Sequence, residues 1–118
     1  MTETYRVAVT EGDRISAGLA MHMLAVPTGV PVEAMVSSGR LSPSVRTARR
    51  LAMYLAHIGF GWPLERVAHA FGVNRATAGS GCRWAEDARD DPRIDRLMDR
   101  LETAVRDICD APGLEPRA

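Results

Sequence analysis

Residues 64–83 read LERVAHAFGVNRATAGSGCR, and this stretch decides the fold that we predict. Two short helical patterns flank Gly72, which tolerates the left-handed backbone of a tight turn. Ala68 is small enough for two crossing helices to touch, and Asn74 is a good cap for the second helix. The apolar anchors around the turn are Val67, Phe71, Val73, Ala78 and Cys82. The pattern predicts a helix-turn-helix with helices over residues 63–71 and 74–89.

The preceding segment, residues 43–58, predicts a helix with two unlike sides. Ser42 can cap this helix, and Pro43 suits its first turn. At about 100° per residue, one side is apolar. Its members are Val45, Ala48, Leu51, Ala52, Leu55 and Ile58. The opposite side carries Arg46, Arg49 and Arg50, which form either a solvated basic face or a phosphate-binding one.

Three further helices complete an all-α prediction of about six helices. We expect them over residues 14–26, 31–38 and 92–108. Asp13 would cap the first helix. The inner face expected for that helix is Ile15, Leu19, Met23 and Val26. The inner face expected for the last helix is Ile94, Leu97, Met98, Leu101, Val105 and Ile108.

The chain of 118 residues fits one domain, long enough to bury a core without disulfides or metals. We assign residues 1–13 to an N-terminal arm, 14–108 to the helical domain and 109–118 to a disordered tail. No apolar run approaches the ~20 residues of a membrane span, and the N-terminus lacks a signal-peptide pattern. We therefore expect a cytoplasmic protein.

Charge is unevenly distributed along the chain. Residues 1–85 contain nine arginines and five acids, a net charge of +4, and residues 86–118 contain six arginines and ten acids, a net charge of −4. This division predicts a basic surface at one end of the molecule. All fifteen basic residues are arginine. The guanidinium fork suits phosphate and guanine. A genome-wide base bias would, however, produce the same preference for arginine over lysine.

The residue types that support catalysis or metal binding are scattered. Cys82 and Cys109 lie far apart, and we expect both to be reduced thiols that pack as small hydrophobes. The three histidines lack the spacing of metal ligands, and His69 is expected at the surface. No serine, cysteine or carboxylate cluster combines a neighbouring base with a reason to be desolvated. We therefore expect no metal, no cofactor and no enzymatic activity.

The second helix of the predicted pair presents polar residues outward near its start. These are Asn74, Arg75, Thr77 and Ser80, with Arg83 further along. Short polar groups and arginine at this end of a helix can hydrogen-bond base edges in a major groove. Gly79 and Gly81 weaken the same helix by ~1 kcal/mol each relative to alanine. They either allow close approach to DNA or mark a helix released from base reading.

Several motifs between residues 15 and 105 resemble one family. They are ARRLAMYLAH (48–57), VAHAFG (67–72), the pair Cys82-Arg83 and DARDDPRID (87–95). Together they resemble the C-terminal duplex-binding domain of DnaA, the bacterial replication initiator, whose fold is similar to that of the Trp repressor. Nothing resembles the ATPase domain of that initiator, because no GxxxxGK[ST] run is present. The chain therefore resembles a free-standing copy of the DNA-binding domain.

The resemblance also implies site residues. Arg49 matches an arginine with a minor-groove or phosphate role, and Arg40 and Arg46 match a basic loop. In the second helix of the pair the family carries Asp-His-Thr-Thr. The residues opposite it here are Asn74, Arg75, Ala76 and Thr77, of which only Thr77 is identical. The resemblance therefore implies the fold more strongly than it implies recognition of the initiator's own box sequence.

Two functions from different classes fit these observations. The first, which we favour, is a double-stranded DNA-binding regulator of replication initiation or transcription in bacteria, associated with the nucleoid. Its candidate contacts are Arg40, Arg46, Arg49, Arg50, Asn74, Arg75, Thr77, Ser80 and Arg83. The second is a protein-interaction module that modulates the replication initiator or another replication or transcription protein. The neutral net charge and the acids near the end of the second helix, such as Glu86, Asp87, Asp90 and Asp91, suit the second function.

Overall fold

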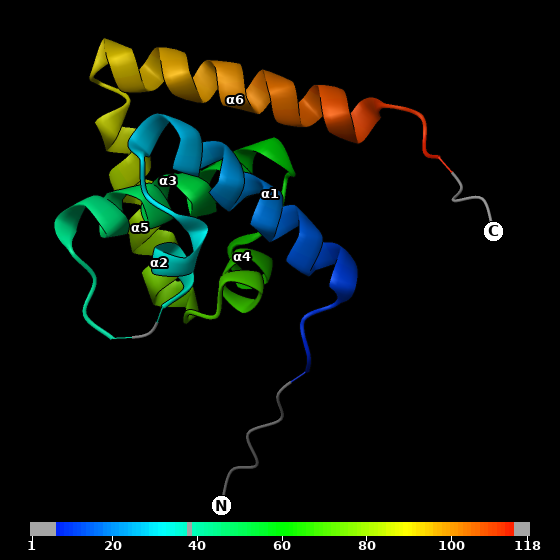
Figure 1. Ribbon diagram of the computed structural model, residues 1–118, viewed down its shortest axis with the longest axis horizontal. Coiled ribbons are helices and arrows are strands. Elements are labelled where there is room, and N and C mark those ends of the chain that lie inside the picture. Colours follow the sequence, from blue (N-terminus) through cyan, green and yellow to red (C-terminus); the bar gives the residue numbers. More distant parts are fainter. Residues whose placement is uncertain (1–6, 38, 115–118) are drawn as a thin grey trace, which may run out of the picture.

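The computed structural model describes residues 7–37 and 39–114, and this part of the chain contains six helices and no strand (Figure 1). The helices are α1 (Glu11–Thr28), α2 (Val32–Val36), α3 (Pro43–Gly59), α4 (Leu64–Phe71), α5 (Arg75–Ala88) and α6 (Pro92–Asp110). The all-α prediction is confirmed. Parts of three expected segments, namely residues 1–6 of the arm, residue 38 of the short helix and residues 115–118 of the tail, lie outside the described residues.

Helix α3 lies at the centre of the fold and contacts all five other helices. Every residue from Leu51 to Ala56 is buried. The predicted apolar side is confirmed, with Val45 and Ile58 partly buried at its ends. Met53, which lies on the same side of α3 as the arginines, is also buried, at 1 % exposure. The arginine side of α3 is therefore open only over its first half.

Helix α1 differs from its prediction in both start and orientation. The cap is Thr10, whose Oγ1 accepts a hydrogen bond from the amide of Asp13 at 3.1 Å. The expected inner face is wrong at its two ends, since Ile15 is 67 % exposed and Val26 is 86 % exposed, whereas Leu19 and Met23 are partly buried. The buried residues are Ala17, Ala20, Met21 and Leu24. Helix α1 therefore packs on a neighbouring row of residues, two of which are alanines.

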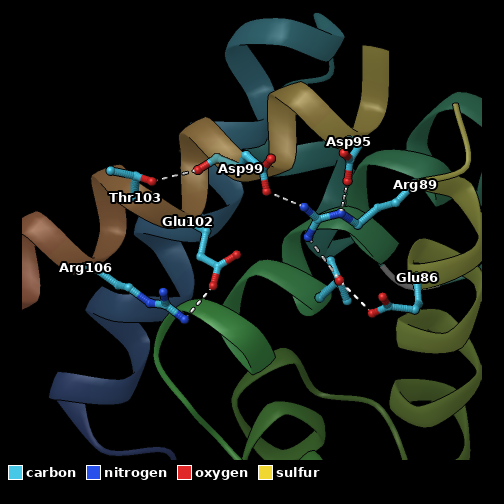
Figure 2. Close-up of polar contacts among 8 residues, drawn as sticks. Glu86, Arg89, Asp95, Asp99, Glu102, Thr103 and Arg106 are labelled. Atoms are coloured by element: carbon cyan, nitrogen blue, oxygen red, sulfur yellow. Dashed lines mark hydrogen bonds and ion pairs between the residues drawn. The ribbon is translucent and has the colours of Figure 1, made fainter. Parts of the chain in front are cut away.

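Helix α6 is fastened to the rest of the molecule through Arg89, the C-cap of α5. Figure 2 shows the Arg89 guanidinium pointing to two carboxylates on α6. Its Nε donates to Asp95 at 2.7 Å, and its Nη2 donates to Asp99. Burial lowers the pKa of Arg89, and the hydrogen bonds to Asp95 and other acceptors raise it by more, so the group stays charged. Three of the C-terminal charges, those of Arg89, Asp95 and Asp99, are thus structural.

The buried hydroxyl of Tyr54 joins α3 to the same network. It donates to Glu86 at 2.7 Å and accepts from Arg89 Nη1 at 3.2 Å. Burial, with the hydrogen bond to Glu86, raises the pKa of Tyr54. Glu86, which we had associated with a partner surface, therefore has an internal role.

The end of α6 departs from its expected packing. Met98 and Val105 are fully buried, whereas Ile108 is 56 % exposed. Residues 106–110 at the end of α6 are all exposed, and Figure 1 shows this end of the helix extending away from the rest of the molecule. Cys109 is accordingly exposed, contrary to expectation. Cys82 is buried as expected, and burial raises the pKa of its thiol to about 11.

Two glycines inside α5 set the distance between neighbouring helices. A Cβ on Gly81 would lie 2.9 Å from Met53 Cε and 3.4 Å from Arg50 Cγ on α3. A Cβ on Gly79 would lie 3.6 Å from Leu64 Cδ1 on α4. Both glycines are buried, so they are not positions at which DNA could approach the helix closely, the first of the two explanations that we considered from sequence. They face the helices that α5 packs against.

The described residues contain no helix that is both long and apolar enough to cross a membrane. They also contain no group of three or more metal-ligating side chains.

Truncation of Leu55 tests the placement of α3. Leu55 is 0 % exposed, so Leu55→Ala should lower the free energy of unfolding by about 2–5 kcal/mol through lost burial and the cavity left behind. Phe71, expected in the core, is only partly buried, so Phe71→Ala should cost less. Urea denaturation measures both, with the exposed Ile108→Ala as a control that stays within about 0.5 kcal/mol of the parent. Equal midpoints for Leu55→Ala and Ile108→Ala would contradict the described core.

The glycines of α5 give a second stability test. Gly79→Ala should raise the free energy of unfolding by up to about 1 kcal/mol, because alanine is the better helix former and its methyl meets Leu64 at an ordinary distance. Gly81→Ala should be less stable than Gly79→Ala, because its methyl would force Met53 to move. Thermal denaturation of the two variants decides the point. A Gly81→Ala variant as stable as Gly79→Ala would show that α3 and α5 are not in tight contact.

Candidate nucleic-acid interface

A depression of about 320 Å³ opens where α3, α5 and the segment before α3 meet. Six of the residues predicted to contact DNA line it: Arg40, Arg46, Arg49, Arg50, Thr77 and Ser80. Gly39, Leu41 and Met53 complete the lining. Two sequence patterns 30 residues apart, the arginine side of one helix and the outward side of another, thus form one surface. We call it the arginine depression.

The start of α3 positions two of these arginines. Ser42 Oγ accepts from the amide of Val45 at 3.4 Å, which confirms the predicted cap. Arg46 lies in α3, as the helical pattern predicted and not in the basic loop to which the resemblance matched it, and its Nη2 donates to the carbonyl of Leu41 at 3.3 Å. Arg40 itself lies before the helix and is exposed. The contact between Arg46 and Leu41 holds the segment that carries Arg40 against α3.

Arg50 is held from the opposite side by an aromatic ring. Its guanidinium carbon lies 5.2 Å from the centre of the Trp84 ring on α5, within the range of a cation–π contact. The Arg50 stem also lies against Gly81. Arg50 therefore links the two helices that form the depression while keeping its charge at the surface.

The arginines of the depression lack the ion pairs that five arginines elsewhere in the described chain make. Arg66, Arg75, Arg89, Arg93 and Arg106 all form ion pairs with carboxylates. Within residues 7–37 and 39–114, no ion pair involves Arg40, Arg46, Arg49 or Arg50. Four positive charges therefore converge here without neutralisation by neighbouring acids, which is the arrangement that attracts phosphate.

The turn between α4 and α5 follows its prediction closely. Gly72 has φ 70°, and the amide of Val73 donates to the carbonyl of Ala68 at 3.0 Å. Asn74 caps α5, since its Oδ1 accepts from the amide of Thr77 at 2.7 Å. This hydrogen bond occupies the Asn74 carbonyl oxygen and leaves its amide group for other contacts. Asn74 lies in the turn and does not line the depression.

Asn74 instead lines a second hollow, about 830 Å³, between the turn and the described end of the N-terminal arm. Val7, Ala8 and Val9 form its other wall. His69, at the surface as expected, contacts the carbonyl of Val7 through Nε2. Residues 7–9 thus lie beside the α4–α5 turn.

The two remaining predicted residues, Arg75 and Arg83, also lie outside the depression. Arg75 begins α5, and its Nε donates to Glu65 on α4 at 2.9 Å. Arg83 lies further along α5 and is exposed. Ser80 Oγ donates to the carbonyl of Thr77 at 3.2 Å, so these two residues of the depression are also bonded to each other.

Three residues that contact the predicted site arginines were not identified from the sequence. Leu41 accepts a hydrogen bond from Arg46, Trp84 stacks on Arg50, and Glu65 pairs with Arg75. Only the last contact had a signal in sequence. The predicted turn places the two short helices next to each other in space, and Glu65 and Arg75 each lie in the first turn of one of them.

The comparisons with known proteins support the fold. No protein-family model and no curated protein matches the chain. A solved structure described as a DNA replication initiation factor is similar, with a TM-score of 0.69 and 25 % sequence identity. The match covers 81 % of this chain and only 30 % of the other. The described helices therefore have the fold of one part of a replication initiation factor, the class of protein to which the sequence resemblance pointed.

Proposed function

We propose that this chain is a binding protein for double-stranded DNA, with α4 and α5 acting as a helix-turn-helix. The observation that carries the proposal is the arginine depression, where four guanidinium groups lack carboxylate partners among the described residues and lie beside Thr77 and Ser80 of α5. In this proposal the arginines bind phosphates, and Arg49 reaches toward a minor groove. The start of α5 enters the adjacent major groove.

The fold of the chain supports this function. The similar solved structure is that of a DNA replication initiation factor, and the chain spans 30 % of its length. A chain with this fold suits a regulator of replication initiation or of transcription, acting in the bacterial cytoplasm on the nucleoid. Because Arg75 and Ala76 depart from the family's pattern, we expect a target sequence different from the initiator's box.

Contact with another replication or transcription protein is the second candidate function. Ile15 and Val26 favour it, because both are exposed apolar residues and lie within about 20° of each other around α1. They are on a different helix from the arginine depression, so the two functions are compatible.

Titration of the chain with random and initiator-box duplexes over a salt series tests the proposal. We expect binding whose affinity falls as salt rises, with no preference for the initiator box. Absence of binding to either duplex at low salt would rule out the DNA-binding function and leave the protein-contact function.

Substitution of Arg49 tests the depression itself. Arg49→Ala should weaken binding to all duplexes to a similar degree and reduce the steepness of log K against log salt by about 0.9, the value of one phosphate contact. Arg100→Ala is the matched control, because Arg100 is an exposed arginine on α6, which does not line the depression. Equal slopes for Arg49→Ala and the parent would remove Arg49 from the DNA surface.

Substitution of Arg75 tests base reading. A bidentate contact from arginine to guanine contributes ~1–3 kcal/mol of discrimination. Arg75→Ala should therefore relax the preference at one base pair and leave binding to random duplexes largely in place. Selection from a randomised duplex pool, performed with parent and variant, measures this. A uniform loss of affinity over all sequences would assign Arg75 to phosphate instead.

A further inference from the structure

The contact between Arg75 and Glu65 has a geometry that bears on base recognition. Arg75 is the first residue of α5, and Glu65 lies in the first turn of α4. The contact is made by Nε of Arg75, which lies 2.9 Å from Glu65 Oε2. Both side chains are open to solvent, at 63 % and 68 % exposure. The pair therefore fixes an arginine at the surface without burying it.

Because Arg75 contacts Glu65 through Nε, it is the opposite edge of the guanidinium that faces outward. A guanidinium can bind two acceptors through Nε and one terminal nitrogen, or through its two terminal nitrogens. With Nε bonded to Glu65, only the terminal pair is available as a fork. Within residues 7–37 and 39–114, neither terminal nitrogen of Arg75 makes a hydrogen bond. The free fork matches the O6 and N7 acceptors of guanine in a major groove.

Glu65 is well placed to remain charged in this role. Helix α4 begins after Pro63, which offers no side-chain cap, so the amides of its first turn attract a carboxylate. The backbone amide of Glu65 and then the hydrogen bond from Arg75 lower the pKa of Glu65 below its usual value.

We propose that Glu65 is a positioning residue that gives Arg75 its base specificity, an inference that rests on the proposed DNA-binding function. Glu65 holds the guanidinium by Nε and leaves the terminal fork for guanine. It also cancels the charge with which Arg75 would otherwise bind any phosphate. Arg75 is in this way restricted to the contact that depends on base identity, while the arginines of the depression bind the backbone.

Two substitutions at Glu65 separate these effects. Glu65→Ala removes both the acceptor and the charge, whereas Glu65→Gln keeps an acceptor for Nε and removes only the charge. Glu33→Ala is the matched control, because Glu33 is an exposed acid in the first turn of another helix, α2. Each variant is compared with the parent and with Arg75→Ala by selection from a randomised duplex pool and by titration of a random duplex over a salt series.

We expect Glu65→Ala to reduce the guanine preference several-fold, within the ~5- to ~150-fold that a whole bidentate contact contributes. Its affinity for random duplex should rise, with a log–log salt slope steeper by up to about 0.9, because the freed Arg75 can bind a phosphate. Glu65→Gln should show the same rise in affinity while keeping most of the guanine preference. Glu33→Ala should change neither quantity.

Three results would overturn the inference while leaving the proposed function in place. One is a guanine preference that is lost in Arg75→Ala but retained in Glu65→Ala. Another is a Glu65→Gln variant that loses the preference as fully as Glu65→Ala. The third is a Glu33→Ala variant whose salt slope steepens as much as that of the Glu65 variants. A parent chain that binds no duplex would instead overturn the proposed function, and the inference with it.

Discussion

The close packing of α5 against α3 is the constraint on which the rest of the structure depends. The backbone of α5 reaches α3 because Gly81 has no side chain, and the tip of Met53 fills the space beside it. This approach closes the arginine side of α3 beyond Arg50 and leaves the first half of that side as the depression. At the other end of α3, Gly59 lies against Val105 in the same manner, where a Cβ would be only 3.0 Å from Cγ1. The central helix is thus enclosed by α5 and α6 at the two places where glycine removes a side chain.

Local signals made much of this fold predictable from sequence. Ser42 and Asn74 cap their helices as predicted, and Gly72 forms the predicted turn. Each of these roles involves only three to five neighbouring residues of the chain. The face of α1 was not predictable in this way, because that helix carries apolar residues on more than one side. A row of large residues through Ile15 and Val26 competes with a row of small ones through Ala17 and Ala20. Which of the two rows is buried depends on the width of the gap between α1 and α3. The periodicity of residues within α1 contains no information about that width.

The candidate site was likewise predictable only in part. Helical periodicity alone placed Arg46, Arg49 and Arg50 on one side of one helix, and the structure keeps them together. What holds them comes from elsewhere: the ring beside Arg50 is 34 residues away in sequence, at Trp84. Arg75, predicted beside Thr77 on one surface, lies outside the depression and is paired with Glu65. A pattern of residue types gives the side of a helix, but it does not give which neighbouring side chain completes a hydrogen bond.

The neutral net charge of the chain is a poor guide to its partners, because among the described arginines one group pairs with carboxylates and another lines the depression without such partners. Arg66 and Arg89 are bonded to carboxylates that come from other helices, so their charges fasten α1 to α4 and α5 to α6 and are cancelled where they lie. The carboxylates in these ion pairs contribute to the neutral net charge of the chain, but they do not line the arginine depression. The field that a phosphate meets depends on the charges within about one Debye length of it, ~8 Å at physiological salt, and not on the sum over the molecule. A chain with no net charge can therefore present a basic surface wherever its acids are used to hold helices together somewhere else.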